Sequence, residues 1–363
     1  MNILITGGTG RIGANLAKQL LAKGHTIRSF IYPGDASRAH KLDGYGGVET
    51  VVGDLRNFAD VKAAVRGVDA IYHLAAAFGG PFDNRQYLEI NGMGTINLLE
   101  AVRSECPQLH RFVYACTEAI YWRLEERIPH LQGKESRYFE EPISEAMVAR
   151  YHQMPYFLTK WVGEELVMAY HYQYGVPATS FRFSTVIEPG AFLNEAGLPK
   201  LFLFSPVYEL YRAQRGAIVD EQAMIDAIKA LWTGEERFLL SRNPNGRPHR
   251  QQFCDVRDIV QGLVLGLERE EASGQEFTLA GAVFDWGEIV PYLAERYGLA
   301  YVEARIPPPN YFEFDLSKIK RLLGYQPQHD FASILATAEA IRRGEETGVI
   351  PTGIRFGPAL VRA

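Results

Sequence analysis

The chain has 363 residues, of which 47% are hydrophobic and 22% charged, values typical of a globular protein with a full core. The net charge is -5, from 38 basic and 43 acidic residues, so the sequence offers no basic surface for nucleic acid or for an anionic membrane. We therefore expect neither of these partners.

The three cysteines, Cys106, Cys116 and Cys254, are too few for a disulfide framework, and no two of them stand at the spacing of metal ligands. We interpret them as reduced core thiols and expect no metal site. No apolar run approaches the ~20 residues of a membrane span. A first strand that begins by Asn2 leaves no room for a cleavable signal peptide. The expected location is cytoplasmic.

Short apolar runs alternate with helical stretches along the first half of the chain. The runs predict strands at 2–6, 27–32, 48–52, 69–74, 111–115 and 178–183. Helical spacing predicts helices at 12–23, 61–65, 95–103 and about 156–171. This alternation indicates right-handed crossovers and a parallel sheet covered by helices on both faces. The predicted fold class is α/β, a Rossmann-type doubly wound parallel sheet.

The pattern becomes less regular after about Pro189, where glycine and proline are frequent. Helices are predicted at 218–231, 259–267 and 289–297, without regular strands between them. We expect residues 1–189 to form a dinucleotide-binding Rossmann domain that carries the catalytic residues. Residues 190–346 are expected to form a smaller, less regular C-terminal substrate lobe, from which the chain is free to cross back. The tail, 347–363, shows no periodicity and receives no assignment.

A glycine-rich turn directly follows the first predicted strand and opens the first helix. The segment reads Thr6-Gly7-Gly8-Thr9-Gly10-Arg11-Ile12-Gly13. Gly7 suits a tight turn, Gly10 lets a pyrophosphate approach the backbone, and Gly13 lets the helix lie close to the sheet. The phosphates would rest on the helix N-terminus, so the turn predicts a dinucleotide site.

The spacing G-x-x-G-x-x-G, together with three further motifs, resembles the extended short-chain dehydrogenase/reductases, the NAD-dependent epimerase/dehydratase family. The motifs are Gly53-Asp54-Leu55, His73-Leu74-Ala75-Ala76, and Asn91 followed by Gly94-Thr95-Ile96-Asn97-Leu98-Leu99. The resemblance runs from residue 1 to about 189 and continues more faintly at 252–267 and 314–327. Each motif alone has a simpler explanation, such as a turn cap or a core side chain, but their order along one chain makes chance a poor explanation.

The resemblance implies a set of cofactor-binding residues, with Asp54 facing the adenine and the fourth strand running along the cofactor. The set is Gly7, Gly10, Arg11, Ile12, Gly13, Asp54, Leu55, Leu74, Ala75, Ala76, Asn91, Tyr156, Lys160 and Phe183. Ile31 stands where the family usually has an aspartate that selects the cofactor. Either Asp35 accepts bonds from the ribose diol of NAD, or Arg38 meets the 2′-phosphate of NADP, and we favour NAD.

Tyr156 and Lys160 form a Y-x-x-x-K pair on the predicted helix at 156–171. A spacing of four places the two side chains on one helical face. A free tyrosine titrates near ~10 and seldom acts as a base at neutral pH. A lysine ammonium and a positive nicotinamide would stabilise the phenolate, so the pair predicts a tyrosine acid/base. In the family the lysine also holds the nicotinamide ribose.

The end of the fifth strand resembles the segment that carries the family's catalytic serine or threonine. Thr117 falls on that position, where its hydroxyl would bond the substrate oxygen that Tyr156 protonates or deprotonates. The simpler alternative is a threonine that caps the strand end. Cys116 stands where serine is common, and we interpret it as a small buried thiol.

Two further residues are candidates for binding the substrate. Glu118 matches the first member of the acid pair of the family's dehydratases, but Ala119 replaces the second, which argues against dehydration. Nucleotide-sugar enzymes of the family carry an arginine where this chain has Gln251, with Arg250 one residue earlier. Arg250 is therefore either a phosphate ligand or a surface arginine.

Three functions stay open for a small-molecule substrate. The first is an oxidoreductase or epimerase that acts on a nucleotide-linked sugar, and the second is a reductase or dehydrogenase of a smaller or apolar ketone or alcohol. The third is an inactive dinucleotide sensor, although such relatives tend to lose the tyrosine–lysine pair. By analogy with the family, a homodimer through the helices at 91–103 and 156–171 is expected.

Overall fold

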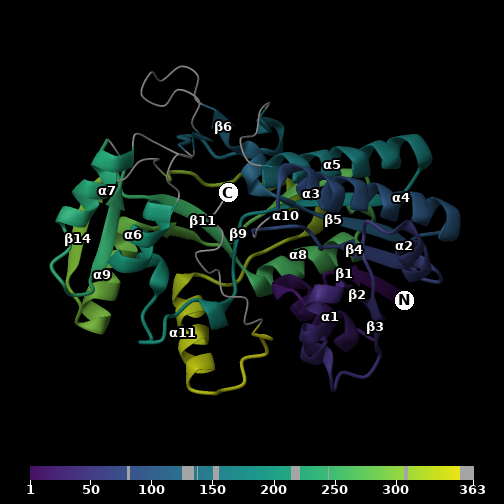
Figure 1. The fold of residues 1–363 in the computed structure, drawn as a ribbon, viewed down its shortest axis with the longest axis horizontal. Helices are drawn as coiled ribbons and strands as arrows, with labels where there is room; N and C mark the ends of the chain where they lie inside the picture. Colours follow the sequence, from purple (N-terminus) through teal and green to yellow (C-terminus); the bar gives the residue numbers. More distant parts are fainter. Residues whose placement is uncertain are drawn as a thin grey trace.

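Seven parallel strands form the central sheet of the protein, whose computed structural model is shown in Figure 1. The structure describes residues 1–79, 82–124, 135–136, 138–149, 155–213, 221–243, 245–305 and 310–351. In spatial order the strands are β12 (Gln275–Leu279), β8 (Ala178–Phe183), β5 (Arg111–Thr117), β4 (Ala70–His73), β1 (Asn2–Thr6), β2 (Thr26–Ile31) and β3 (Val48–Val52). The order reverses on either side of β1, which is the topology of a doubly wound sheet.

Helices cover both faces of this sheet. On one side α1 (Arg11–Ala22) packs beside α8 (Val256–Glu268). On the other side α4 (Gly94–Glu105) lies between α2 (Phe58–Val65) and α5 (Pro155–Tyr174). The predicted α/β Rossmann-type fold is confirmed, and the six strands predicted in the first half are all present.

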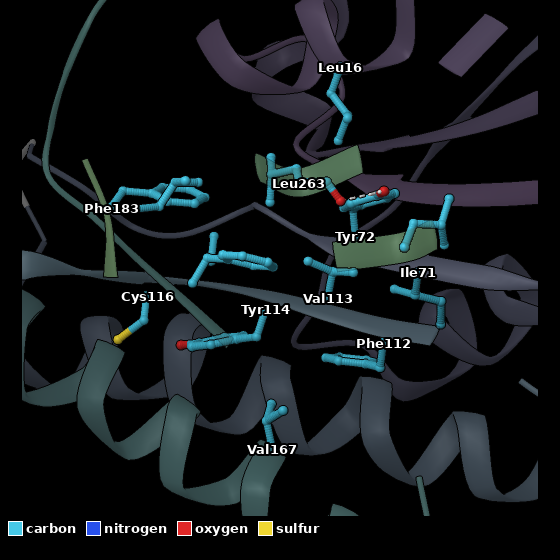
Figure 2. Packing of buried hydrophobic residues seen from close by; sticks show 14 of the residues in the cluster. Leu16, Ile71, Tyr72, Phe112, Val113, Tyr114, Cys116, Val167, Phe183 and Leu263 are labelled. Atoms are coloured by element: carbon cyan, nitrogen blue, oxygen red, sulfur yellow. Dashed lines mark hydrogen bonds between the residues drawn. The ribbon is translucent and has the colours of Figure 1, made fainter. Parts of the chain in front are cut away.

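The two faces of β5 are both buried, because helices cover each of them. Figure 2 shows Phe112 and Tyr114 on the side of α5, where Val167 packs near them, and Val113 on the opposite side with Leu263. A strand covered on both faces needs apolar side chains at consecutive positions, which explains the continuous run in the sequence.

The C-terminal part of the chain contains strands, so the prediction that this half lacks them is wrong. β9 (Thr185–Ile187), β11 (Arg250–Asp255) and β13 (Val283–Asp285) form one small sheet, and β10 (Phe238–Arg242) pairs with β14 (Tyr301–Arg305). Polar residues interrupt the apolar pattern of β11 and β12, which hides both strands from a search for apolar runs.

Helices of the C-terminal part pack around these small sheets, on the left in Figure 1. They are α6 (Phe204–Ala213), α7 (Glu221–Ala230), α9 (Trp286–Tyr297) and α11 (Phe331–Arg342). By contrast, α10 (Ser317–Leu323) packs beside β12 and α8 of the large sheet. The chain does cross back, since α8 and β12 join the large sheet. Of the predicted helix at 218–231, the first residues lie outside the described part, as do residues 352–363 of the tail. No helix within the described ranges is long and apolar enough to cross a membrane.

Candidate active site

A cavity of about 480 Å³ lies where the parallel strands of the large sheet end. Twelve of the residues predicted for cofactor, catalysis or substrate line it together. They are Gly7, Gly10, Arg11, Ile12, Gly13, Leu74, Ala76, Thr117, Glu118, Tyr156, Lys160 and Phe183. The carboxyl edge of a doubly wound sheet is where this fold binds ligands, so the position and the predicted chemistry agree.

The glycine turn forms one wall of the cavity and has the geometry that a dinucleotide needs. Gly7 has φ +73, and a Cβ there would lie 3.1 Å from the backbone of Ala75. A Cβ at Gly13 would overlap the carbonyl oxygen of Gly7, so only glycine lets α1 pack on the turn. Gly10 is the N-cap residue that precedes α1 and provides no side-chain cap, which leaves the first N–H groups of the helix for an anion. These residues fit the pyrophosphate of a dinucleotide.

A buried chain of hydrogen bonds holds the ends of β1 and β4 in register behind the turn. Thr95 Oγ1 donates to the carbonyl of Asn91 at 2.6 Å, so it accepts from His73 Nε2 at 3.0 Å. His73 Nδ1 then accepts from Thr6 Oγ1 at 2.8 Å. Burial holds the pKa of His73 well below its ordinary value, which agrees with a neutral ring. His73 is thus a structural core residue.

Asn91 lies behind the cavity wall and does not line it. Its side chain accepts from the backbone N–H of Ala77 at 2.7 Å and donates to the carbonyl of the same residue at 3.2 Å. It also donates to Thr159 Oγ1 at 3.0 Å, on the helix that carries Tyr156. Asn91 occupies a π-helical segment before α4, a local widening that often marks functional sites. It therefore positions the loop after β4 against α5.

Tyr156 and Lys160 both face the cavity from the first turns of α5. The Tyr156 ring lies 4.8 Å from that of Phe78, and the Lys160 ammonium lies 4.2 Å from the centre of the Tyr114 ring. Burial lowers the pKa of Lys160 to about 8. Burial also raises the pKa of Tyr156 above its ordinary value, with smaller contributions from Cys116 and Tyr87. The expected lowering of the tyrosine pKa therefore does not arise in the protein alone.

Thr117 caps the turn that follows β5, which is the simpler of the two alternatives from the sequence, and its catalytic role stays a prediction. It ends β5, its Oγ1 accepts from the backbone N–H of Ala119 at 3.3 Å, and it lines the cavity. The neighbouring Cys116 donates weakly to the carbonyl of Lys160, with an Sγ to oxygen distance of 3.6 Å. Burial raises the pKa of this thiol well above its ordinary value, so it stays protonated and unreactive.

Glu118 is a buried carboxylate in the cavity wall, held by residues that sequence reasoning missed. Thr185 Oγ1 lies 2.6 Å from Glu118 Oε1, and Gln251 Nε2 lies 3.1 Å from Thr185 Oγ1. Because an amide N–H can only donate, Thr185 accepts from Gln251 and donates to Glu118. The glutamine at the position of the family's arginine was the only sequence signal for this arrangement.

Four other predicted residues do not line the cavity, for identifiable reasons. Asp54 is bound by Arg56, whose Nη2 lies 2.6 Å from Asp54 Oδ2, and Leu55 packs near Gly94. Arg250 pairs with Glu313 at 2.8 Å and lies 4.0 Å from Asp285. In both ion pairs a nearby opposite charge satisfies the side chain that was predicted to meet a ligand. Ala75 supports Gly7 from behind, as described above.

Several cavity residues had no place in the sequence prediction. They are Phe78, Ala115, Cys116, Ala119, Trp122, Phe157, Ser184, Thr185 and Val186. Most of them lie just after the ends of β4, β5 and β8, at the edge where ligands bind in this fold, and that position is the signal that could have found them.

Comparisons with known proteins agree with this geometry. The model of the NAD dependent epimerase/dehydratase family matches residues 3–280. A 3-beta-hydroxysteroid dehydrogenase from Mycolicibacterium neoaurum is 32% identical over 359 residues, which cover 93% of this chain and 90% of that protein. A farnesyl-dihydroquinoline-1-oxide ketoreductase from Stigmatella aurantiaca is 26% identical over 85% of this chain and 76% of its own length. A short-chain dehydrogenase/reductase superfamily protein from Agrobacterium tumefaciens, solved with bound NAD, superposes with a TM-score of 0.77 at 28% identity, covering 95% of this chain and 98% of that one.

Proposed function

Since the chain belongs to the NAD dependent epimerase/dehydratase family, we propose that it transfers a hydride between NAD and the carbinol carbon of a secondary alcohol or ketone, with Tyr156 as the general acid and base. The observation that supports this most strongly is the cavity itself. Thr117, Tyr156 and Lys160 line the same cavity as the glycine turn, although the turn and Lys160 are about 150 residues apart in sequence.

Each of the three side chains has a separate task in this proposal. Bound NAD would supply the nicotinamide that accepts or donates the hydride. The Thr117 hydroxyl orients the substrate oxygen, and the Tyr156 hydroxyl takes up or releases the proton of that oxygen. Lys160 places a positive charge at the base of the site and is shielded from water, so its field acts at full strength on a developing phenolate.

Net oxidation or reduction is favoured over epimerisation. The first two relatives named above are a dehydrogenase and a ketoreductase. Gln251 stands where nucleotide-sugar enzymes of the family carry an arginine, and its side chain donates a hydrogen bond to Thr185. An epimerase keeps its NAD through the catalytic cycle, whereas a dehydrogenase releases NADH.

The decisive experiment measures NADH at 340 nm after mixing the protein with NAD and pregnenolone, a 3β-hydroxysteroid. We expect Tyr156→Phe to lower kcat by about a thousandfold, because general acid–base groups contribute roughly 10²–10⁴. Tyr172→Phe is the matched control, since Tyr172 lies on the same helix and is exposed. Equal rates for Tyr156→Phe and the control would exclude the proposed mechanism.

A homodimer remains part of the proposal. α4 and α5 pack side by side, and exposed apolar side chains occur along this region at Met93, Leu158 and Tyr174. Exposed apolar residues along two adjacent helices suit a protein interface. A light-scattering mass equal to one chain of 40.8 kDa would reject the dimer.

A further inference from the structure

Five lining residues form what we call the substrate end of the cavity: Phe78, Glu118, Trp122, Phe157 and Thr185. None belongs to the glycine turn or to the three proposed catalytic residues. Three are aromatic and come from separate segments, the loop after β4, the turn after β5, and α5. Aromatic walls provide large apolar contact areas, which suit a ring-shaped apolar skeleton.

Trp122 is a fixed part of this end, because other aromatic residues hold it from behind. Its ring centre lies 4.7 Å from that of Phe312 and 6.2 Å from that of Phe139. Only 3% of Trp122 is exposed. Phe78, by contrast, is half exposed and lies against Tyr156. The substrate end therefore combines Trp122, which other aromatic rings hold in place, with Phe78, which lies against the proposed acid/base Tyr156.

Glu118 adds a buried hydrogen-bond acceptor to the same end. Its carboxylate is buried, and the hydroxyl of Thr185, itself bonded by Gln251, donates to it. Oε1 of Glu118 is a hydrogen-bond acceptor, and the oxygens of a diphosphate are acceptors as well. A diphosphate that leaves water for this end would therefore gain no donor from the acceptor Oε1.

The cations near the cavity are already engaged. Among the described lining residues the cations are Arg11 and Lys160, which belong to the predicted cofactor set. Arg11 Nη1 donates to the carbonyl of Val186 at 2.8 Å. Arg250, the remaining candidate for a phosphate, is paired with Glu313 and Asp285. The diphosphate of a nucleotide sugar, in addition to that of NAD, would lie near Glu118. It would find no further cation among the described lining residues.

We propose that the substrate is an uncharged secondary alcohol or ketone with an apolar ring skeleton, and that Glu118, held by Thr185 and Gln251, excludes anionic nucleotide sugars. This inference rests on the proposed hydride transfer for the reacting carbon. It adds the chemical class of the substrate and a specificity-determining group.

The test measures binding without turnover, by calorimetry on the full chain saturated with NADH, which cannot accept a hydride from an alcohol. The probes are pregnenolone, the smaller 2-decalol, and UDP-glucuronic acid. We expect at least one of the two ring alcohols to bind about tenfold or more tightly than UDP-glucuronic acid. Tighter binding of UDP-glucuronic acid, or no binding of either alcohol, would overturn the inference.

Two variants then test the assigned group. Glu118→Gln keeps the size of the side chain and should reduce the preference for the alcohol by about tenfold, through stronger binding of UDP-glucuronic acid. Thr185→Val should act in the same direction, whereas Thr185→Ser, which keeps the hydroxyl, should retain the preference. If Glu118→Gln folds and keeps the preference unchanged, the proposed role of Glu118 is wrong. If Glu118→Gln does not fold, an unchanged preference in Thr185→Val leads to the same conclusion. Failure of the proposed function looks different: the alcohol binds in the same order, but no NADH forms with NAD.

Discussion

The two ends of the cavity are built in different ways. The cofactor end, which we define as the glycine turn at residues 7–13, consists mainly of backbone and small residues. Gly7 and Gly13 are required there because a Cβ would be strained or would overlap the turn. The substrate end consists of long side chains from distant segments, and its bonded pair Thr185 and Gln251 is 66 residues apart. Glycine motifs report backbone geometry directly, whereas side-chain contacts of this kind become visible only in the fold.

The largest expected effect concerns the ion pair that joins the substrate end to α5. Glu164 lies one turn after Lys160, and Arg182 Nη2 is 2.8 Å from its Oε1, with both side chains buried. Arg182 also donates to the Tyr121 hydroxyl at 3.1 Å, in the turn that begins with Glu118. We expect Arg182→Met to lower the free energy of unfolding by about 4 kcal/mol, because a buried carboxylate loses its partner.

Urea denaturation checks this value against two controls. Arg85→Ala removes the exposed Arg85–Glu89 pair and should change stability by no more than about 0.5 kcal/mol. The double variant Arg182→Met with Glu164→Leu should recover most of the loss, because no unpaired charge remains. A single variant as stable as the Arg85→Ala control would show that the two elements are held together by other contacts.

Lys160 lines the cavity, and its burial makes it a source of instability. Its ordinary pKa of 10.5 falls to about 8 in the folded protein. The folded state therefore binds this proton less tightly than the unfolded chain, and stability decreases as pH falls from 10.5 through about 8. We expect Lys160→Met to raise the free energy of unfolding by up to about 3 kcal/mol at pH 7, while hydride transfer is lost.

The pH dependence distinguishes this explanation from simple packing. The gain from Lys160→Met should become small near pH 10.5, where the lysine is neutral in the folded protein and only half protonated in the unfolded chain. Urea denaturation at pH 7 and pH 10 measures the difference. An equal gain at both pH values would mean that the added methionine packs better, and that charge burial is not the cause.

The same contrast explains what could be predicted from the sequence. The inner strands of the first half are apolar runs that are buried on both faces, and only the edge strand β3 is largely exposed. The spacing of Tyr156 and Lys160 places both on one face of any helix, whatever the tertiary fold. β12 was missed because its polar residues conceal a strand that becomes buried only beside β8. The resemblance alone placed Asp54 on the adenine, which stays a prediction, and its ion pair with Arg56, two residues later, could not be read from the sequence.

A single methyl group added at Gly13 should weaken the binding of NAD at the cofactor end. Gly13→Ala would push the turn away from α1, because its Cβ overlaps the Gly7 carbonyl. We expect NAD affinity, measured by calorimetry, to fall by about a hundredfold, equivalent to about 2.7 kcal/mol. Gly46→Ala is the matched control, since a Cβ there meets nothing within 4 Å. If both variants bind NAD equally well, the turn tolerates a side chain and does not form the predicted cradle.

The smallest expected effect tests whether the C-terminal segment belongs to the cofactor end. Asn15, on α1, accepts from the backbone N–H of Ile350 at 2.8 Å and donates to its carbonyl at 3.1 Å. Asn15→Ala leaves this backbone unit without its partner, which should cost about 1–2 kcal/mol locally and speed amide exchange at Ile350 by about tenfold. Lys18→Ala removes only an exposed bond to the Gly348 carbonyl and should change exchange at Ile350 little. The two hydrogen bonds join α1 to a residue 335 positions away, so they can form only in the folded chain. Faster exchange in Asn15→Ala, but not in Lys18→Ala, would show that the cofactor end also depends on a side-chain contact that no sequence motif indicates. Equal exchange in both variants would instead leave that end built from the glycine turn without support from the C-terminal segment.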